Sequence, residues 1–254
     1  MYGDPDPGRQ KTGLIILVAV AVAVLIGGAL LLGQRRTVDT PGGIEAELQR
    51  NPALHDTAAA IRSNFPNAYA AILQRVAAAS RDGGRRAAQD ELNIALRDFI
   101  AGKVNAVASA PARELQRLAG AQFALARALQ AENVTLCAKY TSRGLDPTDR
   151  MSRDAAALVS RASVMMIEAA AAGDHSGRRP RPEASLADNQ IWSARIRVID
   201  AEAARMFADG SIARVGADRQ CRAGVAIYQA LTELPGETTA SLMASLAREA
   251  LGRH

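Results

Sequence analysis

The sequence predicts an all-α protein with a single N-terminal transmembrane helix followed by an antiparallel multi-helix bundle. Two observations predict this fold. Residues 13–33 are all apolar or glycine. In the rest of the chain, apolar residues recur every three or four positions, which is the period of an amphipathic helix. Nowhere do they alternate with polar residues for long enough to indicate a sheet.

The apolar stretch from Gly13 to Gly33 is long enough to cross a membrane. About 20 residues rise about 30 Å as a helix, which matches the hydrocarbon thickness of a bilayer. The stretch is longer than the apolar part of a signal peptide, and no small-residue cleavage site follows it. Its alternation of valine and alanine suits a strand, but a lone strand would leave its backbone groups unpaired in lipid. We therefore expect a permanent anchor over residues 13–33, preceded by a short tail of residues 1–12.

Charge does not fix the orientation of this anchor. Arg9 and Lys11 precede the span and Arg35 and Arg36 follow it, so the nearby positive charges are almost balanced. A signal-anchor protein usually has a short N-terminal tail in the cytoplasm and a large domain on the other side of the membrane. We therefore expect a bacterial inner-membrane protein with its C-terminal domain in the periplasm. The opposite orientation would make the same domain a cytoplasmic-facing adaptor.

Apolar stripes, together with proline and glycine, define the remaining elements. After a juxtamembrane linker over residues 34–50, we expect one helical domain over residues 51–254. It begins with short helices over 51–79, followed by two long helices up to residue 140 and a third that ends near residue 173. Beyond these we expect a long helix to about residue 207, one over 221–231 and one over 239–251. Pro66 and Pro111 stand where a first helical turn tolerates proline.

The stretch GDHSGRRPRPE, residues 173–183, is expected to be a flexible linker between two parts of the domain. It is too rich in glycine, proline and arginine to pack. Three of its residues, Arg178, Arg179 and Arg181, make it basic. They would suit acidic lipid head groups or an acidic partner surface, although most such runs are solvated loops.

Small residues form a ridge along the expected anchor. Ala19, Ala23 and Gly27 recur every four residues, a spacing that lets two membrane helices approach closely. A homodimer through this ridge is therefore a candidate. The same spacing also arises by chance, because alanine and glycine are frequent in this stretch.

The chain has two cysteines, Cys137 and Cys221. Each falls on the apolar stripe of its helix, so both thiols should point inward. A disulfide between the two halves of the domain would suit an oxidising compartment such as the periplasm. Two buried free thiols would suit the same positions, because unpaired cysteine is often buried.

No catalytic, cofactor-binding or metal-binding site is predicted. His55, His175 and His254 are scattered singly, without metal-ligand spacing or a partner nucleophile. Glu168 lies among apolar neighbours and would be a candidate acid if it were buried. An exposed polar edge shared with Arg161, seven residues earlier, explains Glu168 equally well.

Composition excludes some classes of partner and leaves two classes of function. The net charge is +5, and nearly all of the basic residues are arginine. This preference for arginine over lysine is typical of a high-GC bacterial genome. Aromatic residues make up only 4%, too few for a nucleic-acid stacking surface or a sugar-binding cleft. We expect a non-catalytic scaffold or accessory subunit of a cell-envelope complex, which binds the bilayer through residues 13–33 and an unidentified protein through its helices. The alternative is an envelope enzyme acting on glycan with Glu168 as its acid.

Overall fold

The computed structural model describes residues 39–251 except 52–53 and 147–148. Within these ranges the chain is helical and contains no strand, so the all-α prediction is confirmed. The predicted anchor over residues 13–33 and its small-residue ridge lie outside the described residues. In chain order, the helices are α2 (Pro41–Arg50), α3 (His55–Asn64), α4 (Pro66–Gly102), α5 (Val104–Ser109), α6 (Ala112–Glu132), α7 (Val134–Arg143), α8 (Arg153–Ser176), α9 (Leu186–Ile199), α10 (Ala201–Ala208), the short 3₁₀ helix η3 (Ile212–Arg214), α11 (Ala217–Thr232) and α12 (Gly236–Leu251).

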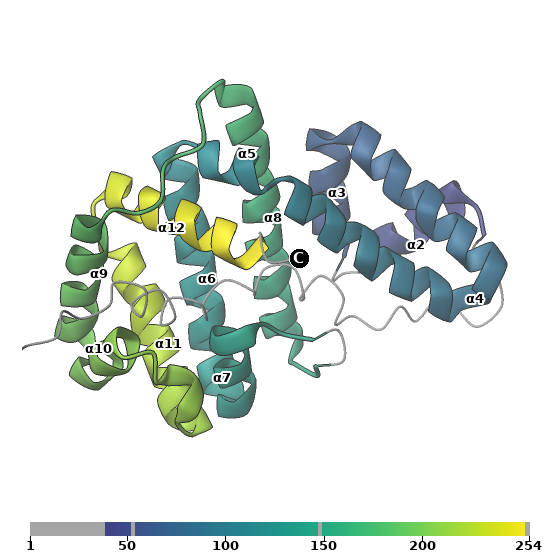
Figure 1. Cartoon of the computed structure of the whole chain (residues 1–254). Coiled ribbons are helices and arrows are strands. Elements are labelled where there is room, and N and C mark those ends of the chain that lie inside the picture. Colours follow the sequence, from purple (N-terminus) through teal and green to yellow (C-terminus); the bar gives the residue numbers. More distant parts are fainter. Residues whose placement is uncertain (1–38, 52–53, 147–148, 252–254) are drawn as a thin grey trace, which may run out of the picture.

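The helices form a lobe and a larger bundle (Figure 1). The lobe consists of α2, α3 and α4, and the bundle consists of α5 to α12. α3 packs along α8 and joins the two parts. The division therefore lies near residue 103, whereas residues 173–183, which were expected to separate two parts, lie within the bundle.

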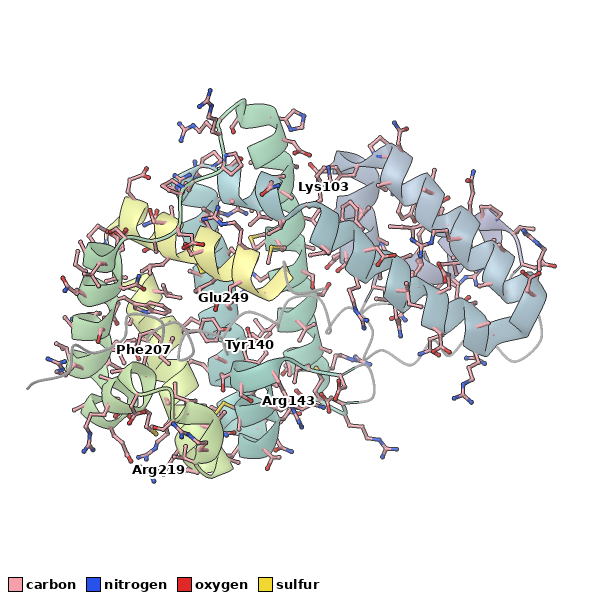
Figure 2. All side chains as sticks on the ribbon, in the orientation of Figure 1. Lys103, Tyr140, Arg143, Phe207, Arg219 and Glu249 are labelled. Carbon is pink, nitrogen blue, oxygen red and sulfur yellow. A yellow bond between two sulfur atoms is a disulfide. The ribbon has the colours of Figure 1, made fainter. Side chains whose placement is uncertain are left out.

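Lys103 lies at the junction between the lobe and the bundle (Figure 2). Its ammonium lies 4.2 Å from the centre of the Phe65 ring and forms an ion pair with Asp174 of α8 at 2.8 Å. The Phe65 ring in turn meets the Phe99 ring edge to face at 5.3 Å. One lysine therefore links the end of α3, the end of α4 and the end of α8.

α4 consists of two helical arms rather than one straight helix. Gly84 has φ +69° and ψ −160°, a conformation that favours glycine, and the chain reverses direction there. Arg75 on the first arm forms ion pairs with Glu91 at 2.6 Å and with Asp98 at 3.1 Å on the second. The two antiparallel arms cover α2 and α3, as Figure 1 shows.

The expected juxtamembrane linker, residues 34–50, is helical from Pro41 onward. The Thr40 side chain accepts a hydrogen bond from the Gly43 N–H at 3.2 Å and caps α2, and Pro41 occupies its first turn. Ile44 and Leu48 are buried in the lobe. The cap and this burial offset the low helix propensity of Gly42 and Gly43.

Two helices that were expected to be long are each broken by a polar residue. Asn133 follows α6, and its side chain accepts a hydrogen bond from the Leu136 N–H and so begins α7. Asp200 follows α9, and its side chain accepts from the N–H groups of Glu202 and Ala203 and so begins α10. Asparagine and aspartate side chains compete with the helical backbone for these N–H groups. Because the apolar period continues across both breaks, periodicity alone did not reveal them.

α8 is the central helix of the bundle and packs against α3, α5 and α6. Within the described ranges it alone is long and apolar enough to cross a membrane by length and composition. Its most apolar window is 56% buried inside the bundle, as for the core helix of a soluble domain. α6 runs antiparallel to it, because Glu132, at the end of α6, accepts a hydrogen bond at 2.6 Å from the N–H of Ser152, just before α8.

Candidate interaction surface

A disulfide joins α7 to α11. The sulfur atoms of Cys137 and Cys221 are 2.00 Å apart, and both residues are buried. One turn further along, Thr141 packs against Gly224, where an added Cβ would lie 2.2 Å from the Thr141 Cβ. Since both contacts advance along the two helices in the same direction, α7 and α11 run parallel. The expectation of an antiparallel bundle is therefore wrong at this pair.

Two buried tyrosines continue the interface between α7 and α11. The Tyr140 and Tyr228 rings stack with their centres 5.9 Å apart, and the Tyr140 hydroxyl donates a hydrogen bond to the backbone oxygen of Gln122 in α6 at 3.4 Å. Figure 2 shows Tyr140 inside the bundle. Burial raises the pKa of both tyrosines, so both remain neutral. Because these groups are closed off from solvent, the cluster does not present a surface to a partner.

The inner face of α9 fixes this helix to the bundle. Trp192 is fully buried, its indole N–H donates to the Ile227 backbone oxygen at 3.2 Å, and its ring meets the Phe207 ring edge to face at 4.8 Å. Ser185 and Asp188 form a capping box at the start of the helix. α9 is therefore held firmly against α10 and α11.

The outer face of α9 is also apolar. Ala187, Ile191, Ala194 and Val198 recur at spacings of four, three and four, so they form one line along the helix, here called the α9 stripe. All four residues are exposed, Ile191 by 46% and Val198 by 74%. Leu186, at the start of the same helix, is 71% exposed.

Most of the large apolar side chains that the described residues expose lie on α9. They are Ile191 and Val198 in the α9 stripe and Leu186 outside it, whereas Ile94 and Val134 lie singly on α4 and α7. Single exposed apolar residues are common, but contiguous ones mark interaction sites. Sequence periodicity does not reveal this surface, because α9 is apolar on both faces and its helical period is weak. In the sequence, the spacing of four, three and four residues between the members of the stripe is the pattern that indicates this second apolar face.

Charged side chains border the α9 stripe on both edges. Asp188 and Arg195 lie on one edge, and the exposed Arg197 lies on the other. Arg195 forms an ion pair with Glu233 of α11. The pKa of Glu233 is lowered because the Gln229 amide, and then Arg195, donate hydrogen bonds to its carboxylate. The edge that carries Arg195 is therefore ordered by the bundle beneath it.

The basic segment before α9 packs against the bundle instead of forming a free linker. The Arg181 side chain is only 12% exposed, and its guanidinium donates to the Ala110 oxygen at 2.8 Å and pairs with Glu237 at 3.0 Å. Its backbone N–H donates to the Ala108 oxygen at 3.0 Å. Arg248 of α12 in turn donates to the backbone oxygen of Arg181. The expectation of a flexible linker over residues 173–183 is therefore wrong at Arg181.

The two other arginines of this segment lie at the surface. Arg178 and Arg179 are exposed, and the Arg178 N–H donates to the Ser176 hydroxyl at 3.1 Å. The predicted group of three is thus divided. Arg181 holds the segment in place, and only Arg178 and Arg179 present their charge to solvent.

Glu168 belongs to an exposed ion-pair group. Its side chain is 38% exposed and forms an ion pair at 3.1 Å with Arg117 of α6, which also binds Glu114 at 2.7 Å. The partner of Glu168 thus comes from α6 and not from Arg161 of its own helix. A half-exposed carboxylate beside a guanidinium lacks the apolar enclosure that the candidate acid required.

His55 and His175 lie on different helices, α3 and α8. His55 contacts Asp56 at 2.9 Å, and the His175 ring contacts the Ala171 backbone oxygen at 2.6 Å. His254 lies outside the described residues. In the part of the chain that the structure describes, no group of three or more potential ligands is close enough to hold a metal ion.

The lobe contains a small apolar cavity between α2, α3 and α4. Its lining includes Leu48, Ile61, Tyr69 and Leu92, and its free volume is about 10 Å³. That volume corresponds to a single water molecule. The cavity is therefore too small for an organic ligand.

Comparison with known proteins assigns no function. No protein family matches the chain, and neither a curated protein nor a solved structure does. The features that point to a function are therefore the α9 stripe and the sequence before residue 39.

Proposed function

We propose that this protein is a non-catalytic, membrane-tethered helical interaction module, acting as a scaffold or accessory subunit of a bacterial cell-envelope complex. Residues 13–33 hold it in the inner membrane, and the α9 stripe contacts its partner. The observation that carries this proposal is the clustering on α9 of three of the five large apolar side chains exposed in the described part of the chain.

The position of the α9 stripe supports this role. The described chain begins at Asp39, whose backbone oxygen accepts a hydrogen bond from Arg81, close to the reversal of α4 at Gly84. α9 lies at the opposite end of the molecule (Figure 1). Only residues 34–38 separate the expected anchor from Asp39, and fully extended they would reach about 18 Å. The lobe is thus the part tied to the membrane, and the α9 stripe is left free for a partner.

The disulfide supports the orientation with the domain in the periplasm. Disulfides persist in oxidising compartments and are rare in the cytosol. The buried Cys137–Cys221 bond therefore favours an exported domain over a cytoplasmic-facing adaptor.

The anchor is tested by its resistance to extraction. The full-length protein is expected to stay in the membrane fraction after an alkaline wash. Val22→Arg places a charge at the centre of the span and should weaken insertion by about 3 kcal/mol. Val22→Leu keeps the span apolar and serves as the control. Release of the wild-type protein by the wash would rule out the anchor.

The α9 stripe is tested by a matched pair of substitutions in the full-length protein. Ile191→Asp puts a charge in the stripe, whereas Ile94→Asp changes an equally exposed isoleucine on α4, since the two are 46% and 44% exposed. The proteins that co-purify after mild solubilisation, including differently tagged copies of this chain, are then quantified. Burial of an unpaired carboxylate is costly. We therefore expect Ile191→Asp to lower recovery of the partner at least tenfold and Ile94→Asp to leave it unchanged. Equal recovery with both variants would remove the stripe as a contact surface.

A further inference from the structure

We infer that the partner of the α9 stripe is a second copy of this chain, with the two α9 helices packed antiparallel about a two-fold axis. This inference rests on the proposed function, because it requires the stripe to be a contact surface. Three properties of the stripe support it. They are the sizes of its residues, the charges on its edges, and its low content of the large apolar and basic residues that bind a bilayer.

The residues of the stripe are self-complementary in size. In an antiparallel pair centred between residues 192 and 193, Ala187 lies opposite the partner's Val198, and Ile191 lies opposite the partner's Ala194. Every large side chain then meets a small one, so the two helices can pack closely. A parallel pair would instead set Ile191 against the partner's Ile191, and alanine against alanine.

The edges of the stripe are complementary in charge in the same arrangement. A two-fold axis across an antiparallel pair brings the same edge of both helices together. Asp188 then lies about 3 Å along the helix axis from the partner's Arg195, given a rise of about 1.5 Å per residue. In a parallel pair opposite edges would meet, and Arg195 would face the partner's Arg197. Charge therefore favours the antiparallel pair.

A bilayer surface suits the α9 stripe less well than a second helix does. Helices that lie on membranes combine large apolar residues with many lysines and arginines along the polar face. In the stripe every second residue is alanine, and each edge carries only one arginine. Small residues give little insertion into lipid but allow close approach of a second backbone.

A single helix pair is a small interface, below the roughly 1,000 Å² expected of a stable complex. Tethering both copies in one membrane raises their effective concentration and compensates for the small area. The contact is distinct from the predicted ridge at Ala19, Ala23 and Gly27. Because α2 and α9 lie at opposite ends of the molecule, two copies joined at α9 keep their anchors apart (Figure 1).

The register gives a direct test by cross-linking in membranes. Two differently tagged full-length chains are expressed together, one carrying Ala187→Cys and the other Val198→Cys, and the membranes are oxidised gently. In the antiparallel pair these positions lie opposite each other. The two copies of position 187 lie about 16 Å apart along the axis, as do the two copies of position 198. That separation exceeds the roughly 7 Å limit for a disulfide.

We expect the mixture to cross-link at least tenfold more than either variant expressed alone. Two controls accompany it. Ala71→Cys, at an exposed position on α4, should not cross-link with either variant. Ala23→Leu with Gly27→Leu blocks close approach through the ridge and should leave the cross-linking of the mixture unchanged.

Two results would overturn the inference. Cross-linking of each variant with itself, to the same extent as in the mixture, would indicate a parallel pair. Absence of cross-linking in every combination would exclude a second copy as the partner. If Ile191→Asp then still lost a different co-purifying protein, the proposed function would stand with that protein as the partner. If Ile191→Asp lost nothing, the proposed function would fail as well.

Discussion

Replacing Gly173 with alanine is expected to lower the free energy of unfolding by more than about 3 kcal/mol, the upper end of the usual range for overpacking. A Cβ at this position would lie 1.7 Å from the backbone oxygen of Ala106 and 2.6 Å from its carbonyl carbon. Both are backbone atoms of α5, so no side-chain rotation relieves the clash. α5 and α8 would have to move apart, and α8 is the central helix of the bundle.

Gly120 provides a matched control for this substitution. It lies in the interior of α6, and nothing lies within 4 Å of an added Cβ. Gly120→Ala should therefore raise the free energy of unfolding by about 0.5–1 kcal/mol through the better helix propensity of alanine. Urea unfolding of the solubilised protein is followed by the fluorescence of Trp192, the single tryptophan of the chain, which is fully buried. Equal stabilities of the two alanine variants would contradict the close contact between α5 and α8.

The sequence predicted the buried stripes but not this contact. The helical period of the sequence places Leu92, Leu96, Leu118 and Leu125 on the apolar sides of their helices, and all four are buried. The period of a helix shows which of its sides is apolar, but it does not show which helix covers that side. Gly173 was predicted to begin a linker, because residues 173–183 are rich in glycine, proline and arginine. In the structure Gly173 is the point where two backbones touch.

The candidate interaction surface was hidden from the sequence for a related reason. The helical period places Ile196 on one side of α9 and Ile191 and Val198 on the other, and both sides are apolar. The packing of Trp192 on α11 decides which side is inside, leaving Ile196 at 0% exposed and Val198 at 74%. Which side of α9 faces the core depends on tertiary contacts between distant parts of the chain. The sequence of one helix in isolation does not determine it.

Removing the disulfide is expected to lower the free energy of unfolding by an amount similar to that of the Gly173 substitution. Cys137 and Cys221 are 84 residues apart in sequence. A loop of that length gives about 4.5 kcal/mol in the chain-entropy account, and loss of a native disulfide costs about 2–5 kcal/mol in practice. Thr141 packs on Gly224 along the same interface, so loosening the bond also loosens that contact. A variant with both Cys137→Ala and Cys221→Ala should match the reduced wild-type protein in urea unfolding. Stability equal to that of the oxidised protein would contradict the bond.

The same two cysteines decide the compartment of the domain. Cells are quenched with an alkylating agent, the protein is denatured, and its reactive thiols are counted before and after reduction. Because the chain has only two cysteines, an exported domain should show none before reduction and one pair after it. Two free thiols from the outset would contradict both the disulfide and the periplasmic orientation and would favour the cytoplasmic-facing adaptor. Denaturation must come before labelling, because both residues are buried in the folded protein and a free thiol there would escape the reagent as completely as a bonded one.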